Sequence, residues 1–161
     1  MKSINLILFS IAFFSFLDYG IAQSKKKADK ETAIWRYELE PAGTGIQGSY
    51  QIKVWSYSKK AETAIEQAKK NAVHGIIFKG FPSKERLSGQ KALAQNPNLE
   101  EVKSEFFKEF FQDGGKYLKF VTLVNNGAIA SEDRIKIGKE YKIGVIVSVN
   151  VAALRKDLED A

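Results

Sequence analysis

The residue with the widest chemical range in this 161-residue chain is its one histidine, His74, because an imidazole can act as a general base or bind a metal. A catalytic interpretation pairs it with a carboxylate and a serine, for example Glu66 or Asp113 with Ser83. The spacing does not favour such a trio. We therefore expect His74 to be a structural residue at the end of a helix, where the helix macrodipole favours a cation.

Composition excludes most metal and thiol chemistry. The chain has no cysteine, which rules out disulfides, thiolate zinc sites and cysteine nucleophiles. One histidine cannot build a multi-histidine site, and Asp113 with Glu132 and Asp133 lacks the spacing of an EF-hand. We predict no catalytic residue, no cofactor and no metal ion, and hence no enzyme.

Two further patterns contain residue types that occur in nucleotide-binding or catalytic sites, but their sequence context does not favour such a site. Residues 43–48 read G-x-G-x-x-G, but they join two β-patterned runs, whereas a dinucleotide site needs a helix to follow. The motif is interpreted as a hairpin loop. Acidic pairs are interpreted as solvated surface charge: Glu38 with Glu40, Glu100 with Glu101, and Glu132 with Asp133.

The aromatic side chains offer candidates for binding. Residues 105–111 read EFFKEFF, and at 100° per helical residue their phenylalanines cover an arc of about 140°, more than a helix on one sheet needs. Either a neighbouring loop also covers this face, or part of it docks a partner or an apolar ligand. Phe107 and Phe111 are the candidates for an exposed edge. Trp35 and Trp55 are either exposed on the first hairpin or cross-strand core partners.

The elements that position these residues begin with two strands. Residues 33–40 alternate with period two, placing Trp35 and Tyr37 on one face, and residues 41–45 end the run. Residues 50–58 alternate again and are rich in β-forming residues. The two runs predict a β-hairpin with a long loop.

From Lys60 the period becomes helical, with a stripe made mostly of alanine at positions 61, 64, 68 and 72. Small side chains let a helix lie close to a sheet, so we expect this helix to pack on the inner face of the sheet. Gly75 is a plausible stop. Residues 76–78 are then either a short buried strand or the last helical turn.

The second half of the sequence predicts a mixture of loops, strands and helices. A loop over 83–97 with a helical turn near 90–94 leads to a helix from Asn98 to residue 113, which has Leu99, Val102, Phe106 and Phe110 on one face. A strand over 117–124 and a turn at 125–127 follow. The last predicted elements are an edge strand at 134–137, a strand over 141–150 and a short closing helix. The predicted fold is a single α+β domain over residues 32–161. It has an antiparallel sheet of about four strands, an alanine-rich helix on one face and a second, phenylalanine-rich helix.

Two segments together resemble a known type of domain: the alanine stripe after a strand, and residues 141–150 running into Val151, Leu154 and Leu158. This pattern resembles the LPP20-like and flagellar-assembly-T N-terminal domains, which are small exported α+β domains. The resemblance implies a structural or accessory role in the cell envelope and transfers no catalytic residue. The chain departs from it in lacking a lipid-anchoring cysteine and in the insertion over residues 81–115.

The N-terminus has the pattern of a cleavable secretory signal. Lys2 precedes the apolar run 4–17, and small residues follow at positions 20 and 22, so we place the cut after Ala22. The apolar run is shorter than the roughly 20 residues of a membrane-spanning helix. We predict a signal peptide over 1–22, a mature chain without a transmembrane segment, and a periplasmic or secreted location.

Residues 23–31 are polar and basic and predict a disordered linker. Lys25, Lys26 and Lys27 could make weak contact with an anionic surface, although lipid-reading clusters usually have about 4–8 basic residues. The net charge of +6 does not indicate nucleic-acid binding, because an exported protein meets little nucleic acid and no reader motif occurs.

These patterns predict an exported, non-enzymatic accessory or structural protein of the bacterial cell envelope that acts by contact with another, unidentified envelope protein. The alternative is a small-ligand-binding protein with an apolar pocket between the sheet and the phenylalanine-rich helix.

Overall fold

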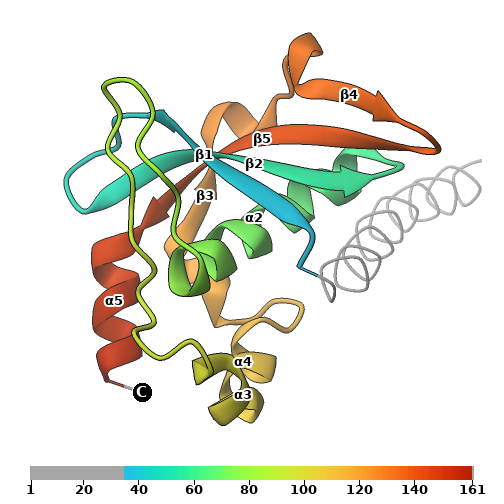
Figure 1. Ribbon diagram of the computed structural model, residues 1–161. Helices are drawn as coiled ribbons and strands as arrows, with labels where there is room; N and C mark the ends of the chain where they lie inside the picture. Colours follow the sequence, from blue (N-terminus) through green and yellow to red (C-terminus); the bar gives the residue numbers. More distant parts are fainter. Residues whose placement is uncertain (1–34, 161) are drawn as a thin grey trace, which may run out of the picture.

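The computed structural model describes residues 35–160, so the predicted signal peptide (1–22), the linker (23–31) and Lys25, Lys26 and Lys27 lie outside the described residues. The predicted α+β fold is confirmed: a five-stranded antiparallel sheet has the order β1-β2-β5-β3, and β4 also pairs with β5. The long helix α2 crosses one face of this sheet, and α3 and α4 lie on the same side (Figure 1). The strands are β1 (Tyr37–Gly43), β2 (Ser49–Ser58), β3 (Val121–Leu123), β4 (Arg134–Ile137) and β5 (Glu140–Asn150). The α-helices are α2 (Ala61–Phe78), α3 (Leu99–Val102), α4 (Ser104–Phe110) and α5 (Val151–Glu159), and the 3-10 turns are η1 (Lys116–Phe120), η2 (Val124–Gly127) and η3 (Ser131–Asp133).

The hairpin of β1 and β2 follows the predicted alternation. Ile52 and Val54 of β2 are fully buried, and they pair with Val147 and Val145 of β5, which are equally buried. The strand predicted over residues 33–40 lies further along the chain: β1 begins at Tyr37 and runs past Pro41 to Gly43, with a register shift between Pro41 and Gly43. An edge strand tolerates proline, since its N–H is not needed by a second neighbour.

Helix α2 packs on the inner face of the sheet through its alanine stripe, as predicted; Ala64, Ala68 and Ala72 are fully buried. The prediction that Gly75 stops the helix is wrong. The helix continues to Phe78. Gly80, which follows the C-cap Lys79, has a φ of 68° that suits glycine, and its N–H donates to the Gly75 carbonyl at 2.7 Å. Residues 76–78 are therefore the last helical turn.

The long loop after α2 is extended where a helical turn was predicted near residues 90–94. Its backbone amides at Leu93 and Ala94 donate to the carbonyls of Ile76 and Ile77, at 3.1 and 2.8 Å. These carbonyls belong to the last turn of α2 and lack a partner within the helix. The extended loop satisfies them, which a local helical turn would not.

The predicted phenylalanine-rich helix is broken into α3 and α4 at Lys103, whose φ of −109° and ψ of 39° are not helical. The break leaves Val102 exposed, so the prediction that Val102 shares the apolar face is wrong. The strand predicted over residues 117–124 is also shorter, because η1 replaces its first half. A 3-10 turn places residues i and i+3 on one side, and Tyr117 and Phe120 are both buried.

The C-terminal elements agree with the sequence. The turn at residues 125–127 has positive φ at all three positions, β4 forms the predicted edge piece, and α5 closes the chain with Asn150 as its N-cap. Among residues 35–160, we find no helix with both the length and the apolar character needed to cross a membrane.

Candidate functional site

His74 lies in an aromatic cluster at the crossing of α2 and β1. Its side chain is 2% exposed, and its ring stacks on the indole of Trp35 with 3.5 Å between centroids. The Tyr37 hydroxyl lies 2.6 Å from Nδ1, and the Glu100 carboxylate lies 3.3 Å from Nε2. The indole N–H of Trp35 also donates to Glu100, at 3.1 Å.

Burial sets the protonation of this cluster. It lowers the pKa of His74 to about 3, with a smaller effect from the Lys79 ammonium, so the imidazole is neutral at physiological pH. Burial likewise raises the pKa of Tyr37 and of Glu100. A neutral ring that accepts from Tyr37 at Nδ1 donates from Nε2 to Glu100, which satisfies all three groups.

One prediction for His74 is thus corrected. It is not a cation at a helix terminus, because it lies one turn before the end of α2 and burial keeps it neutral. Its carboxylate neighbour is Glu100, and the trio with Glu66 or Asp113 and Ser83, which the spacing did not favour, is not among the contacts of the described residues. Trp35 stacks on the buried imidazole ring.

Phe107 and Phe111 are core residues, so the prediction that they form an exposed edge is wrong. They are 2% and 7% exposed, and their rings lie 6.2 Å apart in a stacked arrangement. Phe107 also contacts Phe78 of α2, and Phe111 contacts both His74 and Tyr117. Rings from α2 and η1 cover this face, whereas the sequence pointed to the preceding loop for that cover.

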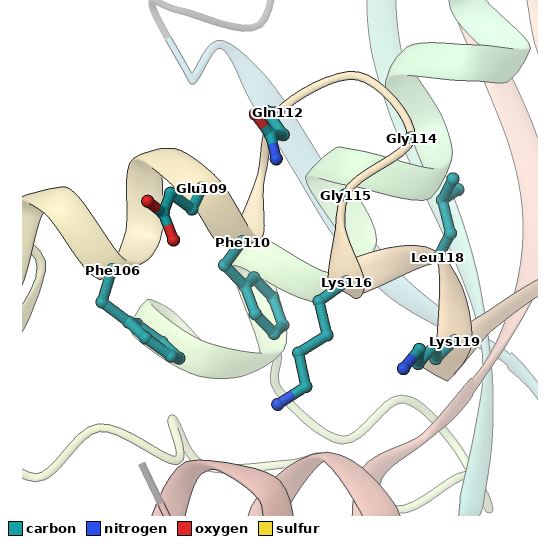
Figure 2. Close-up of a pocket in the computed structure, with 9 residues that line it drawn as sticks. All are labelled: Phe106, Glu109, Phe110, Gln112, Gly114, Gly115, Lys116, Leu118 and Lys119. Atoms are coloured by element: carbon teal, nitrogen blue, oxygen red, sulfur yellow. The ribbon is translucent and has the colours of Figure 1, made fainter.

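The sequence suggested a ligand pocket between the sheet and the phenylalanine-rich helix. In the structure α2 packs on the sheet, and the rings of Phe78 and Phe107 meet between α2 and α4. A groove of about 600 Å³ lies instead on another side of α4, between it and η1. Figure 2 shows the rings of Phe106 and Phe110 and the side chain of Lys116 pointing to the same side of this groove. Lys116 also bonds Asp157 of α5 at 2.7 Å.

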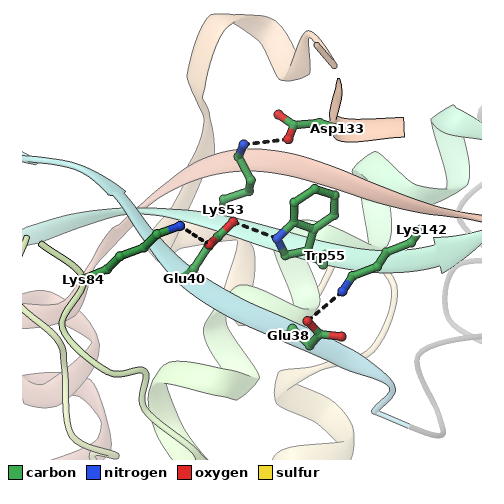
Figure 3. A network of polar contacts seen from close by, with 7 residues as sticks. All are labelled: Glu38, Glu40, Lys53, Trp55, Lys84, Asp133 and Lys142. Atoms are coloured by element: carbon green, nitrogen blue, oxygen red, sulfur yellow. Dashed lines mark hydrogen bonds and ion pairs between the residues drawn. The ribbon is translucent and has the colours of Figure 1, made fainter. Parts of the chain in front are cut away.

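The sheet face opposite α2, which we call the outer face, carries an ordered polar network around Trp55 (Figure 3). The indole N–H of Trp55 donates to Glu40 at 2.8 Å, and the ammonium groups of Lys53 and Lys142 lie 5.5 and 5.2 Å from the Trp55 ring. Trp55 therefore lies on the opposite face from Trp35, and the two are not core partners.

The charges of the outer face are held in pairs. The Lys142 ammonium bonds Glu38 at 2.7 Å and holds the pKa of that carboxyl below its usual range, and Lys84 at 2.8 Å does the same for Glu40. Lys53 bonds Asp133 at 2.6 Å. Such pairs contribute roughly 0–1 kcal/mol each near a surface, so their main effect here is to fix the side chains around Trp55.

Gly144 of β5 explains how Trp55 lies across the sheet. The two residues are register partners, and a Cβ at position 144 would come within 3.1 Å of Cζ3 of Trp55. The missing side chain lets the indole cover the β5 backbone. A glycine inside a strand pattern signals such a close approach, and this signal was present in the sequence.

A second aromatic residue extends the outer face. The Arg36 guanidinium lies 4.1 Å above the centre of the Tyr57 ring and also forms an ion pair with Glu140. Tyr57 pairs with Lys142 of β5, which in turn pairs with Ile135 of β4. The outer face thus continues from the aromatic residues to the exposed isoleucines of β4.

The described residues contain no group of three or more histidine, aspartate or glutamate side chains that could hold a metal ion. The structure separates the four interaction candidates that the sequence offered. Trp55 lies on the outer face, whereas Trp35, Phe107 and Phe111 pack in or against the core. No protein-family model matches the chain, and we find no significant match to a curated protein or to a solved structure.

Proposed function

We propose that this protein is an exported, non-enzymatic accessory or structural protein of the bacterial cell envelope that binds another protein through the outer face. The observation that carries the proposal is the fixed position of Trp55 over Gly144, between Lys53 and Lys142. Tryptophan, tyrosine and arginine are the residues most enriched at interface hot spots, and an ordered indole loses little conformational entropy on binding.

The surroundings of His74 support the non-enzymatic part. The imidazole is buried under Trp35, is neutral, and has both nitrogens engaged by Tyr37 and Glu100. A general base needs access to the proton that it takes. This arrangement instead fits a polar contact that fixes α2 against β1.

The export part rests on the N-terminal sequence pattern and on the resemblance to exported α+β domains. N-terminal sequencing of the protein recovered from cell fractions tests it. We expect Gln23 as the first residue, in a periplasmic or secreted fraction. Intact protein starting at Met1 in the cytoplasm would contradict this part.

The outer face is tested by placing a photo-crosslinking amino acid at Tyr57 and, as a matched control, at Lys108, which is exposed on α4. We expect a discrete adduct with an envelope protein from position 57 only. Trp55→Ala should abolish that adduct while the circular dichroism spectrum stays unchanged. Equal labelling from both positions would contradict docking at the outer face.

Ligand binding is the second candidate function, and the groove between α4 and η1 favours it. Its volume of about 600 Å³ falls in the range of small-molecule sites, and Phe106 and Phe110 supply apolar lining. Titration with a long-chain fatty acid, read by calorimetry, tests this candidate. Binding that is lost in Phe106→Ala supports it, and the absence of heat at millimolar ligand contradicts it.

A further inference from the structure

Strand β4 is a free edge of the sheet. It pairs with the Glu140–Ile143 end of β5, and no other strand among residues 35–160 pairs with it. All four of its residues are exposed. In an antiparallel pair, alternate residues turn their N–H and C=O groups away from the partner strand, so β4 presents unpaired backbone donors and acceptors.

The hairpin turn determines which residues of β4 direct their backbone N–H and C=O groups toward the free edge. Ile137 and Glu140 are joined by the two residues Gly138 and Lys139, and Gly138 has a φ of 60°, as expected for a tight hairpin turn. The pair that flanks such a turn exchanges backbone hydrogen bonds, so Lys136 directs its backbone groups to the free edge.

The two edges of the sheet differ in their protection. Strand β1, at the opposite edge, contains Pro41 and a register shift, and both features discourage the addition of a further strand. Strand β4 has neither feature. It presents two large apolar side chains instead: Ile135 is 46% exposed and Ile137 is 43% exposed.

The charge around β4 indicates which kind of strand would pair favourably with it. Arg134, Lys136 and Lys139 are all basic and exposed. Of the three nearby acids, Asp133 and Glu140 are engaged by Lys53 and by Arg36, and the exposed Glu132 leaves the basic residues in excess. A second copy of β4 would therefore bring like charges together, whereas an acidic strand would pair favourably with this edge.

We propose that β4 is a strand-addition site for an extended acidic segment of a partner protein. In that segment, β-branched residues would lie beside Ile135 and Ile137, and acidic residues would lie beside Arg134 and Lys136, because neighbouring residues of adjacent strands share a face. This inference deepens the proposed function, on which it rests, since the isoleucines continue the outer face.

The test measures binding of a fluorescently labelled peptide of alternating valine and glutamate to the purified protein, by fluorescence anisotropy. A peptide with lysine in place of glutamate is the matched control. We expect the acidic peptide to bind and to slow amide hydrogen exchange at residues 134–137. Arg134→Glu with Lys136→Glu should weaken it by about tenfold or more, while Lys108→Glu on α4 leaves it unchanged.

Lys136→Pro addresses the backbone directly, because proline removes the outward N–H and blocks the edge. We expect it to abolish binding, and the double charge reversal keeps the test decisive if the proline variant does not fold. Equal binding of both peptides, wild-type affinity in the reversal variant, or dimerisation of the protein through β4 would overturn the proposal.

The crosslinking experiment separates this inference from the proposed function. An adduct from Tyr57 that persists in Arg134→Glu with Lys136→Glu, together with no peptide binding, would refute strand addition and leave outer-face docking standing. Peptide binding at β4 without any adduct from Tyr57 would refute outer-face docking and support the edge site.

Discussion

Gly75→Ala tests how closely α2 approaches β1. In an exposed helix interior this change stabilises the helix by about 1 kcal/mol, because alanine has the higher helix propensity. Here a Cβ at position 75 would overlap Cδ1 of Leu39 and lie 3.1 Å from Cε2 of Tyr37. The structure therefore predicts the opposite sign from helix propensity.

The size of the effect depends on which neighbour can move. The Leu39 side chain is half-buried and can shift its tip, but Tyr37 is held by the 2.6 Å contact between its hydroxyl and Nδ1 of His74. Overpacking a core typically costs about 1–3 kcal/mol. After the gain in propensity, we expect a net loss of up to about 2 kcal/mol, or up to roughly 8 °C in Tm.

Urea and thermal unfolding of the purified chain, followed by circular dichroism, measure this loss. The control is the double variant Gly75→Ala with Leu39→Ala, in which the overlapping atoms are gone. It should lose less stability than the sum of the two single variants, because the two sites share one contact. A higher Tm for Gly75→Ala alone would refute the close approach of α2 to β1.

Three other substitutions test separate parts of the packing. Phe107→Asp with Phe111→Asp buries two carboxylates, and urea unfolding should show a loss of more than about 3 kcal/mol; near wild-type stability would show that the rings are not core. Asn150→Ala removes the acceptor of the Ala153 amide (2.9 Å) at the start of α5 and should cost about 1 kcal/mol in the same assay, whereas Asn150→Asp should keep the cap. For His74, burial lowers the pKa from 6.5 to about 3, so between these pH values the unfolded chain holds a proton that the folded chain lacks, and stability falls as the pH drops. His74→Gln should reduce the slope of unfolding free energy against pH by about 1 kcal/mol per unit between about pH 6 and 5, and an unchanged slope would contradict neutral burial.

The outer face and the His74 cluster differ in what their polar groups can do. The His74 cluster satisfies its donors and acceptors internally, through Tyr37, Glu100 and Trp35. The outer face leaves the indole of Trp55 and the edge of β4 partly open to a partner. This contrast is why we assign a structural role to the first and a binding role to the second.

Local pattern alone determined much of the fold. Alternation predicted β2 and β5 nearly to the residue, because a half-buried strand places successive side chains on opposite faces. The alanine stripe predicted how α2 packs, since small side chains permit close approach. The turn at residues 125–127 and the edge strand β4 also followed from residue types a few positions apart.

The tertiary structure decided where long-range contacts override local pattern. Glu100 contacts His74 and Trp35 although they lie 26 and 65 positions away in the sequence, and no local spacing predicts these contacts. Other contacts between residues distant in the sequence place Gly75 against Leu39 and bury Phe107 and Phe111. Sequence periodicity states which side chains share a face, but only the packed neighbours decide which faces are covered, and hence which side chains are left for a partner.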